Sequence, residues 1–528
     1  MRMAALDILA LHASARPNDV AVIDHDRHMA LADFNELVNR YGNVLLDCGV
    51  RAGEKVLWTG QNSLEVVAIN HASRKVGGVC VPMNYRLAPD EAQYVIENAD
   101  AVVVLFDIEQ TEQLESIRDQ LPLVRRWISF RAASVTDPSS PGPAWADDLE
   151  VLAEAAATTE PEPEGQDDAA GTTMIYTSGT TGKPKGTVRR TDTSEQAAKN
   201  SAEFVALMGW NGDDVYLSTG PLYHSAPLGF MLAVQALGGS VVIQRHFDPE
   251  EWLRLVETHR VTTSFSAPTP IRRVVDLPPG VVEGYDTSSL QRLLANAAPW
   301  PFELKRKYVE RINDTSLFEV YGSTELGVNT LLLPPDQMRK PGSCGRPIPG
   351  VTIELIDDEG NVVTEPMQPG ELFVKSEATF ATYYKDAEKY ENGRRGDFLS
   401  VGDIAYFDDE GYFYICDRKN DMIISGGVNI YPAETEAVLV AHPDIADAAV
   451  FGIPDEEWGE AVHAVITLYP GHEAADDDIA AFCREHLAGY KVPRTFDRMD
   501  EIPRSASGKI LKRELREPYW AGRTSRVG

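Results

Sequence analysis

A ten-residue stretch at positions 177–186, TSGTTGKPKG, gathers residue types suited to binding phosphate. It holds four hydroxyl-bearing residues, three glycines and two lysines. Glycine lets backbone N–H groups face a ligand, hydroxyls donate further hydrogen bonds, and lysine adds mobile positive charge. A flexible surface turn is the ordinary alternative for so many small polar residues. If the stretch does bind a ligand, a polyphosphate fits its composition.

The stretch is not a P-loop. A P-loop carries a serine or threonine directly after its Gly-Lys pair, and the hydroxyl of that residue binds magnesium. Here Gly182 and Lys183 are followed by Pro184, which has no hydroxyl. A phosphate site at this point would therefore belong to a different architecture.

The surrounding residues predict an α/β protein whose strand ends carry the site. The apolar segment TTMIY (172–176) predicts a buried strand directly before the loop. Helical patterns alternate with β-rich runs up to about residue 122, and strand candidates VYLSTG, SVVIQ, TTSFSAP and LFEVYG follow the loop. Ligands of such sheets bind at the carboxyl ends of strands, where several of these runs end in Gly, Pro, Ser or Thr.

The chain changes character twice more towards its C-terminus. From about residue 342, short alternating strands with turn glycines predict a smaller β-rich module. After Arg418, helix and strand patterns over roughly 110 residues predict a separate small α+β domain. The acidic segment 158–171 predicts a surface connection ahead of the loop.

Composition limits the classes of partner. The chain has 528 residues, which is too long for one core and predicts two or more domains. Acidic residues outnumber basic ones 81 to 49, so the surface should repel nucleic acid and anionic membranes. Five cysteines lie far apart without C-x-x-C spacing, which disfavours a zinc site and a disulfide framework.

The sequence predicts a cytoplasmic protein with at most peripheral membrane contact. The first 20 residues resemble an amphipathic helix, in which Asp7 and His12 interrupt any signal-peptide core. Nowhere do 18 apolar residues follow one another. We expect no integral membrane segment, and a homodimer is left open.

Seven motifs in order resemble the AMP-forming acyl-CoA synthetases and their relatives, the acyl- and aryl-CoA ligases, luciferases and peptide-synthetase adenylation domains. The resemblance covers essentially the whole chain and is most like a fatty-acyl-CoA ligase. It implies an α/β domain with a β-rich module over residues 1–418 and a small mobile α+β domain over 419–528. The motifs are TSGTTGKPKG (177–186), PLYH (221–224), NAAP (296–299), YGSTE (321–325), VGD (401–403), DRKNDMIISGGVNIYPAETE (417–436) and PRSASGKILKREL (503–515).

The resemblance implies ATP, Mg²⁺ and coenzyme A as cofactors and assigns residues to each. Tyr321 would offer a flat face to adenine, and Asp403 would accept the ribose hydroxyls, with Arg418 as a second ribose and phosphate contact. The residues expected to bind phosphate are Thr177, Ser178, Gly179, Thr180, Thr181, Gly182, Lys183 and Lys185. Those expected to form the opposite nucleoside wall are Asn296, Ala297, Ala298 and Pro299, with Gly322 beside Tyr321.

Six residues carry the chemistry that the resemblance implies. Glu325 would hold Mg²⁺, and Thr324 would donate to phosphate, although a Glu in this position also suits a helix cap. Lys509 would bridge the carboxylate and the α-phosphate during adenylation. His224 would lie at the acyl pocket, or else serve as a hydrogen-bonded core residue. Glycines in SGGVN (425–429) would allow the thiol to pass; they are Gly426 and Gly427.

Some positions depart from the commonest pattern of this family. Val401 stands where threonine is more usual, and Asn420 occupies the hinge position, where Asn tolerates the backbone change that a hinge requires. The pair Arg189 and Arg190 follows the loop where a histidine often occurs, and the sequence offers no reason for it.

The expected reaction joins a carboxylic acid to coenzyme A through an acyl-adenylate with release of AMP. A carrier-protein phosphopantetheine is the alternative acceptor, and a non-catalytic nucleotide-binding relative is the alternative class. The segment SAPLGFML (225–232) is apolar enough to predict a fatty, steroid-like or aryl acid. The sequence does not define the chain length.

Overall fold

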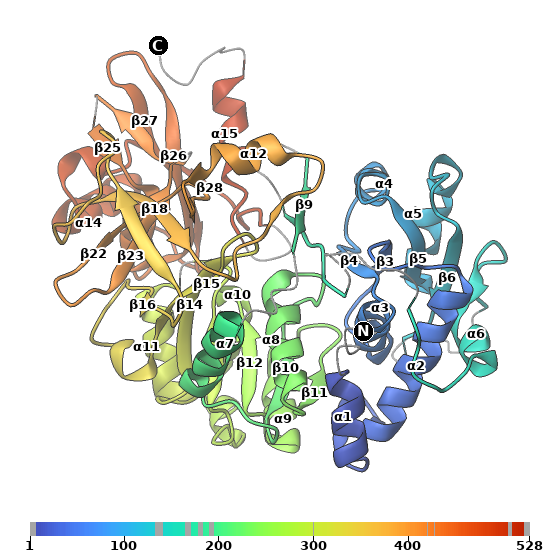
Figure 1. Ribbon diagram of the computed structural model, residues 1–528. Helices are drawn as coiled ribbons and strands as arrows, with labels where there is room; N and C mark the ends of the chain where they lie inside the picture. Colours follow the sequence, from blue (N-terminus) through green and yellow to red (C-terminus); the bar gives the residue numbers. More distant parts are fainter. Residues whose placement is uncertain are drawn as a thin grey trace.

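The computed structural model describes residues 7–132, 141–163, 171–177, 183–189, 195–298, 300–419, 421–426, 428–504 and 509–521. Figure 1 shows three parts in chain order: a blue N-terminal part, a green and yellow central part, and an orange and red C-terminal part. Five sheets form the framework of the described residues.

The N-terminal sheet is parallel, with the strand order β4-β3-β5-β6-β7. An inner strand such as β5 is a nearly continuous apolar run, AVVVLFD, because both faces of a parallel sheet are buried. The strands are β3 (Lys55–Thr59), β4 (Val79–Met83), β5 (Ala101–Asp107), β6 (Arg126–Phe130) and β7 (Asp147–Asp148). The helices of this part are α1 (Ile8–Ala15), α2 (Leu31–Asp47), α3 (Leu64–Lys75), α4 (Pro89–Asn98), α5 (Thr111–Glu115) and α6 (Leu149–Ala155).

The central sheet has nine strands in the order β16-β15-β14-β13-β12-β10-β11-β1-β2. Its six inner strands run parallel, and β2, β15 and β16 run antiparallel to their neighbours. The strands are β1 (Val20–Asp24), β2 (Arg27–Ala30), β10 (Val215–Ser218), β11 (Ser240–Ile243), β12 (Thr263–Ser266), β13 (Arg292–Ala295), β14 (Leu317–Ser323), β15 (Gly327–Leu332) and β16 (Arg346–Pro347). The helices are α7 (Glu195–Met208), α8 (Ser225–Ala236), α9 (Pro249–His259), α10 (Pro268–Val275) and α11 (Phe302–Arg311).

A β-rich module follows the central sheet, as the sequence predicts. Its strand order is β20-β21-β18-β22-β23, with β17 paired to β18. The elements are β17 (Thr352–Ile356), β18 (Gly370–Lys375), α12 (Ala387–Asn392), β20 (Arg394–Arg395), β21 (Phe398–Leu399), β22 (Asp403–Phe407) and β23 (Phe413–Arg418). A three-stranded sheet beside the module contains β8 (Tyr176–Thr177), β9 (Lys185–Val188) and β19 (Thr382–Tyr383).

The C-terminal part is a small α+β domain with its own apolar core. A long hairpin of β26 and β27 joins β24, β25 and β28 in one sheet. The elements are β24 (Ile423–Ser425), β25 (Val428–Ile430), α13 (Pro432–Val440), β26 (Ile445–Asp455), β27 (Gly459–Leu468), α14 (Asp476–His486), β28 (Thr495–Arg498) and α15 (Lys512–Trp520). The boundary at 418/419 stays a prediction.

The predicted fold class is confirmed, while one local expectation is wrong. Residues 172–176 do not form a full buried strand: β8 covers only Tyr176 and Thr177, and Thr173 makes a single bridge to Cys80. Met174 and Ile175 are buried as expected from their apolar side chains. No helix in the described parts of the chain is long and apolar enough to span a bilayer.

Candidate active site

A cavity of about 1500 Å³ lies where the carboxyl ends of the central strands meet the β-rich module and the C-terminal domain. Residues that follow β10, β12, β13 and β14 line it, as expected for a sheet of parallel strands. The C-terminal domain contributes residues 501–504 and Lys509. The cavity therefore requires both domains.

Glu325 lines this cavity and follows the end of β14 by two residues. Its Oε1 accepts hydrogen bonds from Thr177 Oγ1 at 3.0 Å and from the Tyr383 hydroxyl at 3.1 Å. Burial, and then the Glu325 carboxylate, raise the pKa of Tyr383, which keeps this hydroxyl a donor. The structure thus brings Thr177 and Glu325, 148 residues apart, to one point.

Arg189 is explained by its contacts in the same region. Its guanidinium donates to the carbonyl oxygen of Thr324 at 2.6 Å and to that of Ala378 at 3.0 Å. Burial lowers the pKa of Arg189, and the charge of Glu325 acts against this. Arg189 therefore fixes the backbone beside Glu325. Neither Arg189 nor Tyr383 was assigned a role from the sequence, because their partners are distant in the chain.

The N-terminus of α8 also faces the cavity. His224 is the N-cap residue of this helix and lines the cavity together with Ser225. Ser225 Oγ lies 2.7 Å from Thr324 Oγ1, so α8 and the end of β14 are joined by hydroxyls. The loop before His224 is held by Asn62, whose Nδ2 donates to the Gly220 carbonyl oxygen at 3.0 Å.

The predicted nucleoside wall is formed in part. Asn296 and Ala297 line the cavity after β13, and Ala297 has a φ of 73°, in the left-handed region that few non-glycine residues adopt. Asn296 stabilises this turn, because its Nδ2 donates to Val320 and its Oδ1 accepts from the Ala297 N–H. Ala298 does not line the cavity.

Tyr321, Asp403 and Arg418 form a connected group. The Tyr321 hydroxyl donates to Asp403 Oδ2 at 2.6 Å, and Arg418 Nε lies 3.5 Å from Asp403 Oδ1. Gly322 and Arg418 line the cavity, whereas Tyr321 and Asp403 do not. In this structure Tyr321 therefore joins β14 to β22, and its predicted stacking on adenine stays a prediction.

Lys509 enters the cavity from the C-terminal domain. Desolvation by the surrounding protein, and then the positive charge of Arg418, lower the pKa of Lys509. The negative charges of Asp403 and Glu325 act in the opposite direction. The residue is nevertheless solvent-exposed, because it borders an open cleft.

The two lysines of the loop have partners outside the cavity. Lys183 Nζ lies 4.6 Å from the centre of the Tyr94 ring, and Lys185 forms an ion pair with Asp386. Gly426 has a φ of 58° and lies against Trp458, whose ring leaves no room for a Cβ, so glycine is required there for packing. Gly426 is not among the residues that line the cavity.

Several predicted residues lie outside the described parts of the chain. They are Ser178, Gly179, Thr180, Thr181, Gly182, Arg190, Pro299, Asn420 and Gly427. Among the described residues, no group of three or more His, Cys, Asp or Glu side chains gathers to hold a metal. Glu325 fits Mg²⁺, because this ion is commonly held by one or two carboxylates together with substrate phosphates.

This fold and this site define an adenylate-forming enzyme. The AMP-binding enzyme family matches residues 9–384, and the AMP-binding enzyme C-terminal domain matches residues 434–509. The chain therefore belongs to the AMP-binding enzyme family, and the predicted AMP-forming CoA ligase is confirmed at the level of this family. Ligases of this family use ATP, Mg²⁺ and coenzyme A, as predicted.

Known relatives cover nearly the whole chain. The long-chain-fatty-acid–CoA ligase FadD13 of Mycobacterium tuberculosis is 33% identical over 94% of both chains. A fatty acid–[acyl-carrier-protein] ligase, ScoC of Streptomyces coeruleorubidus, is 30% identical over 98% of this chain and 97% of its own. The o-succinylbenzoate CoA synthetase of Bacillus subtilis, solved with its acyl-adenylate intermediate, is 29% identical over 99% of both chains, with a TM-score of 0.82.

Proposed function

We propose that this enzyme activates a hydrophobic carboxylic acid as its acyl-adenylate and then transfers the acyl group to coenzyme A. One observation carries the proposal: a single cavity contains Lys509, Arg418 and Glu325 on its polar side and aromatic side chains at its apolar end. The polar side suits phosphates, and the apolar end suits the acid.

The apolar end of the cavity is formed by α7, α8 and β12. Successive rings lie close together: Phe204 and Trp210 at 5.8 Å, Trp210 and Phe230 at 6.0 Å, and Phe230 and Phe265 at 5.8 Å. On α8, Ala226, Gly229 and Ala233 line the cavity; their spacing places them on one face of the helix. Small residues beside aromatic walls favour a bulky hydrophobic acid, whether fatty or aryl.

The polar residues would act by placing charge around the reacting groups. Lys509 and Arg418 would offset the negative charge that gathers when a carboxylate meets the α-phosphate. Thr177 and Tyr383 would hold the Glu325 carboxylate in place. Mg²⁺, when bound by Glu325, would supply neutralisation of phosphate charge. His224 and Ser225 would border the acyl group.

The direct test is acid-dependent formation of AMP and pyrophosphate by the purified full chain. A panel of fatty, aryl and short polar acids should give turnover with the first two classes only. Thioester should form when coenzyme A is added. No AMP from any acid on the panel would contradict the proposal.

A carrier-protein acceptor is the second candidate, because one relative is named as a fatty acid–[acyl-carrier-protein] ligase. Each acceptor can be added to the same enzyme-bound acyl-adenylate. Faster transfer to a phosphopantetheine-bearing carrier protein than to coenzyme A would favour this second candidate. We expect the reverse.

A further inference from the structure

Lys509 lies between Arg504 and Ile510 in the chain, and these two residues form the base of the Lys509 segment, which is fixed to strand β26. They form an antiparallel bridge with each other, and Leu511 N donates to the Pro503 carbonyl oxygen at 2.9 Å. The Arg504 guanidinium contacts both carboxylate oxygens of Asp447, at 2.8 and 2.6 Å. Asp447 lies on β26, so the position of this strand decides where Lys509 points.

A residue of the large domain reaches β26 at this point. Arg272 on α10 donates from Nη1 to the carbonyl oxygen of Ala446 at 2.5 Å. Ala446 directly precedes Asp447, and the two bonded residues are 174 positions apart in the sequence. The neighbouring residues Thr269 and Pro270 on α10 line the cavity. Arg272 thus connects the cavity wall to the strand that carries the base of the Lys509 segment.

A second contact holds the other side of the segment. Lys512, the first residue of α15, places Nζ 2.8 Å from Glu436 Oε1 and 3.8 Å from Asp417 Oδ2. Asp417 belongs to β23 and also accepts from the Ala433 N–H at 3.0 Å. Asp417 adjoins the predicted boundary at 418/419. If the domain turned about this boundary, the contact between Lys512 and Asp417 would move less than contacts farther from the boundary.

We propose that Arg272 is a positioning residue, which holds the C-terminal domain in the orientation that presents Lys509 to the cavity. The inference rests on the proposed function, in which Lys509 serves adenylation, and on the mobile C-terminal domain that the family resemblance implies, which would turn before thioester formation. A substantial turn of the domain would move Ala446 away from Arg272 and break this bond. Arg272 therefore favours the adenylating orientation over the other.

The test measures the two half-reactions separately in the full-length enzyme. Arg272→Met keeps a long side chain but removes the donor, so adenylation should fall roughly 10-fold, the scale for losing one charged hydrogen bond. Thioester formation from supplied acyl-adenylate and coenzyme A should be unchanged or faster. Arg272→Lys retains one charged donor and should recover most of the adenylation rate.

A matched control is Arg306→Met on α11, since this exposed arginine pairs with Glu303 and Glu310 of its own helix. It should leave both half-reactions unchanged. Three outcomes would overturn the inference. They are an equal loss of both half-reactions in Arg272→Met, a fall in the melting temperature of Arg272→Met large enough to account for its lost activity, and no recovery of the adenylation rate in Arg272→Lys.

Lys509→Ala separates the inference from the proposed function. If Lys509→Ala slows adenylation and Arg272→Met does not, only the role of Arg272 is wrong. If Lys509→Ala leaves adenylation intact, the proposed role of Lys509 is wrong. The role of Arg272 is then wrong as well, because Arg272 is proposed to act by positioning Lys509.

Discussion

Glu325 owes its orientation to two hydroxyl groups from distant parts of the chain, Thr177 and Tyr383. We expect Glu325→Gln to retain these hydrogen bonds, because an amide oxygen can accept them. The substitution removes the negative charge that would bind Mg²⁺. Acid-dependent pyrophosphate release should therefore fall by roughly two to three orders of magnitude.

The control for Glu325→Gln is Glu303→Gln, an exposed position on α11 whose partner Arg306 lies on the same helix. It should have the activity of the unaltered enzyme. Both variants should be measured over a series of magnesium concentrations. Near-normal release from Glu325→Gln at saturating magnesium would mean that another residue holds the metal.

Lys509 should give the adenylation step an alkaline limit. A lysine is cationic only below its pKa, and the surrounding walls and then Arg418 lower the pKa of Lys509. The charge is therefore lost at a lower pH than for an ordinary lysine, and the rate should fall as pH rises through this lowered pKa. Pyrophosphate release measured from neutral to alkaline pH checks the expectation.

Lys509→Arg provides the comparison, because a guanidinium stays charged throughout this range. Its rate should be lower, since its shape differs, but the alkaline fall should disappear. The same alkaline fall in both proteins would assign the titration to another group.

The roles of single residues were predicted unevenly. Glu325 and Asn296 belong to motifs that resemble those of the family, and the resemblance assigned both to the ATP site. The structure shows both lining the cavity. Arg189 and Tyr383 could not be placed. Their functions depend on contacts with Thr324 and Glu325, and no local pattern encodes such contacts.

At the scale of elements, α8 contains a glycine that packing does not require. A Cβ at Gly229 would meet no atom within 4 Å, and the residue lines the cavity. Glycine inside a helix costs about 0.5–1 kcal/mol relative to alanine. Gly229→Ala should therefore raise the free energy of unfolding by about that amount while raising KM for the bulkiest acids.

The comparison for Gly229→Ala is Gly42→Ala in α2, where a Cβ would approach Pro161 Cγ to 2.6 Å. Gly42→Ala should lower the denaturation midpoint, because the helix must move away from that proline. If Gly229→Ala left KM unchanged for every acid in a size series, the space beside Gly229 would not be part of the acyl site.

Several elements were predictable because an apolar run or a helix-start residue marks them in the sequence. Strands β4 and β5 read as continuous apolar runs, and α13 begins at Pro432 as a helix start should. The segment 172–176 was not predicted correctly. Its apolar residues are buried, but β8 extends over only two residues, so burial alone did not produce a strand.

For the whole molecule, the sequence predicted the order of the parts but not how they are joined. Contacts such as Arg272 with Ala446 and Arg245 with Asp107 cross between parts that are far apart in the chain. Charged residues in isolation most often lie on the surface, and nothing near Arg245 in the sequence indicates that it is buried. Such contacts between distant parts of the chain can be identified only from the folded structure.

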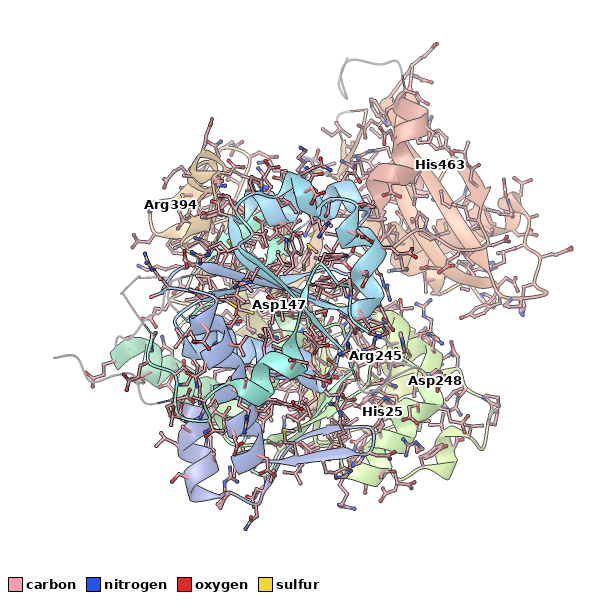
Figure 2. All side chains as sticks on the ribbon, turned by 90° about the vertical axis from the view of Figure 1, so that its right-hand side faces the viewer. His25, Asp147, Arg245, Asp248, Arg394 and His463 are labelled. Atoms are coloured by element: carbon pink, nitrogen blue, oxygen red, sulfur yellow. The ribbon has the colours of Figure 1, made fainter. Side chains whose placement is uncertain are left out.

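Arg245 joins the N-terminal sheet to the central sheet, and Figure 2 labels it where the two parts meet. Its Nη2 lies 3.0 Å from Asp107 Oδ2 and 2.9 Å from Glu109 Oε2. The side chains of Arg245 and Asp107 are 4% and 0% exposed. Burial raises the pKa of Asp107 even though Arg245 opposes this shift.

Arg245→Met should consequently destabilise the large domain by about 3–5 kcal/mol, because Asp107 would remain as a buried charge without compensation. Adding Asp107→Asn should recover part of the loss by removing that charge. Arg254→Met removes an arginine whose pair with Glu251 is exposed, and it should change stability by less than about 1 kcal/mol. Urea denaturation of the four proteins measures these differences. If Arg245→Met were no less stable than Arg254→Met, the pair would not hold the two sheets together. If Asp107→Asn gave no recovery, the cost would come from lost packing instead of the buried charge.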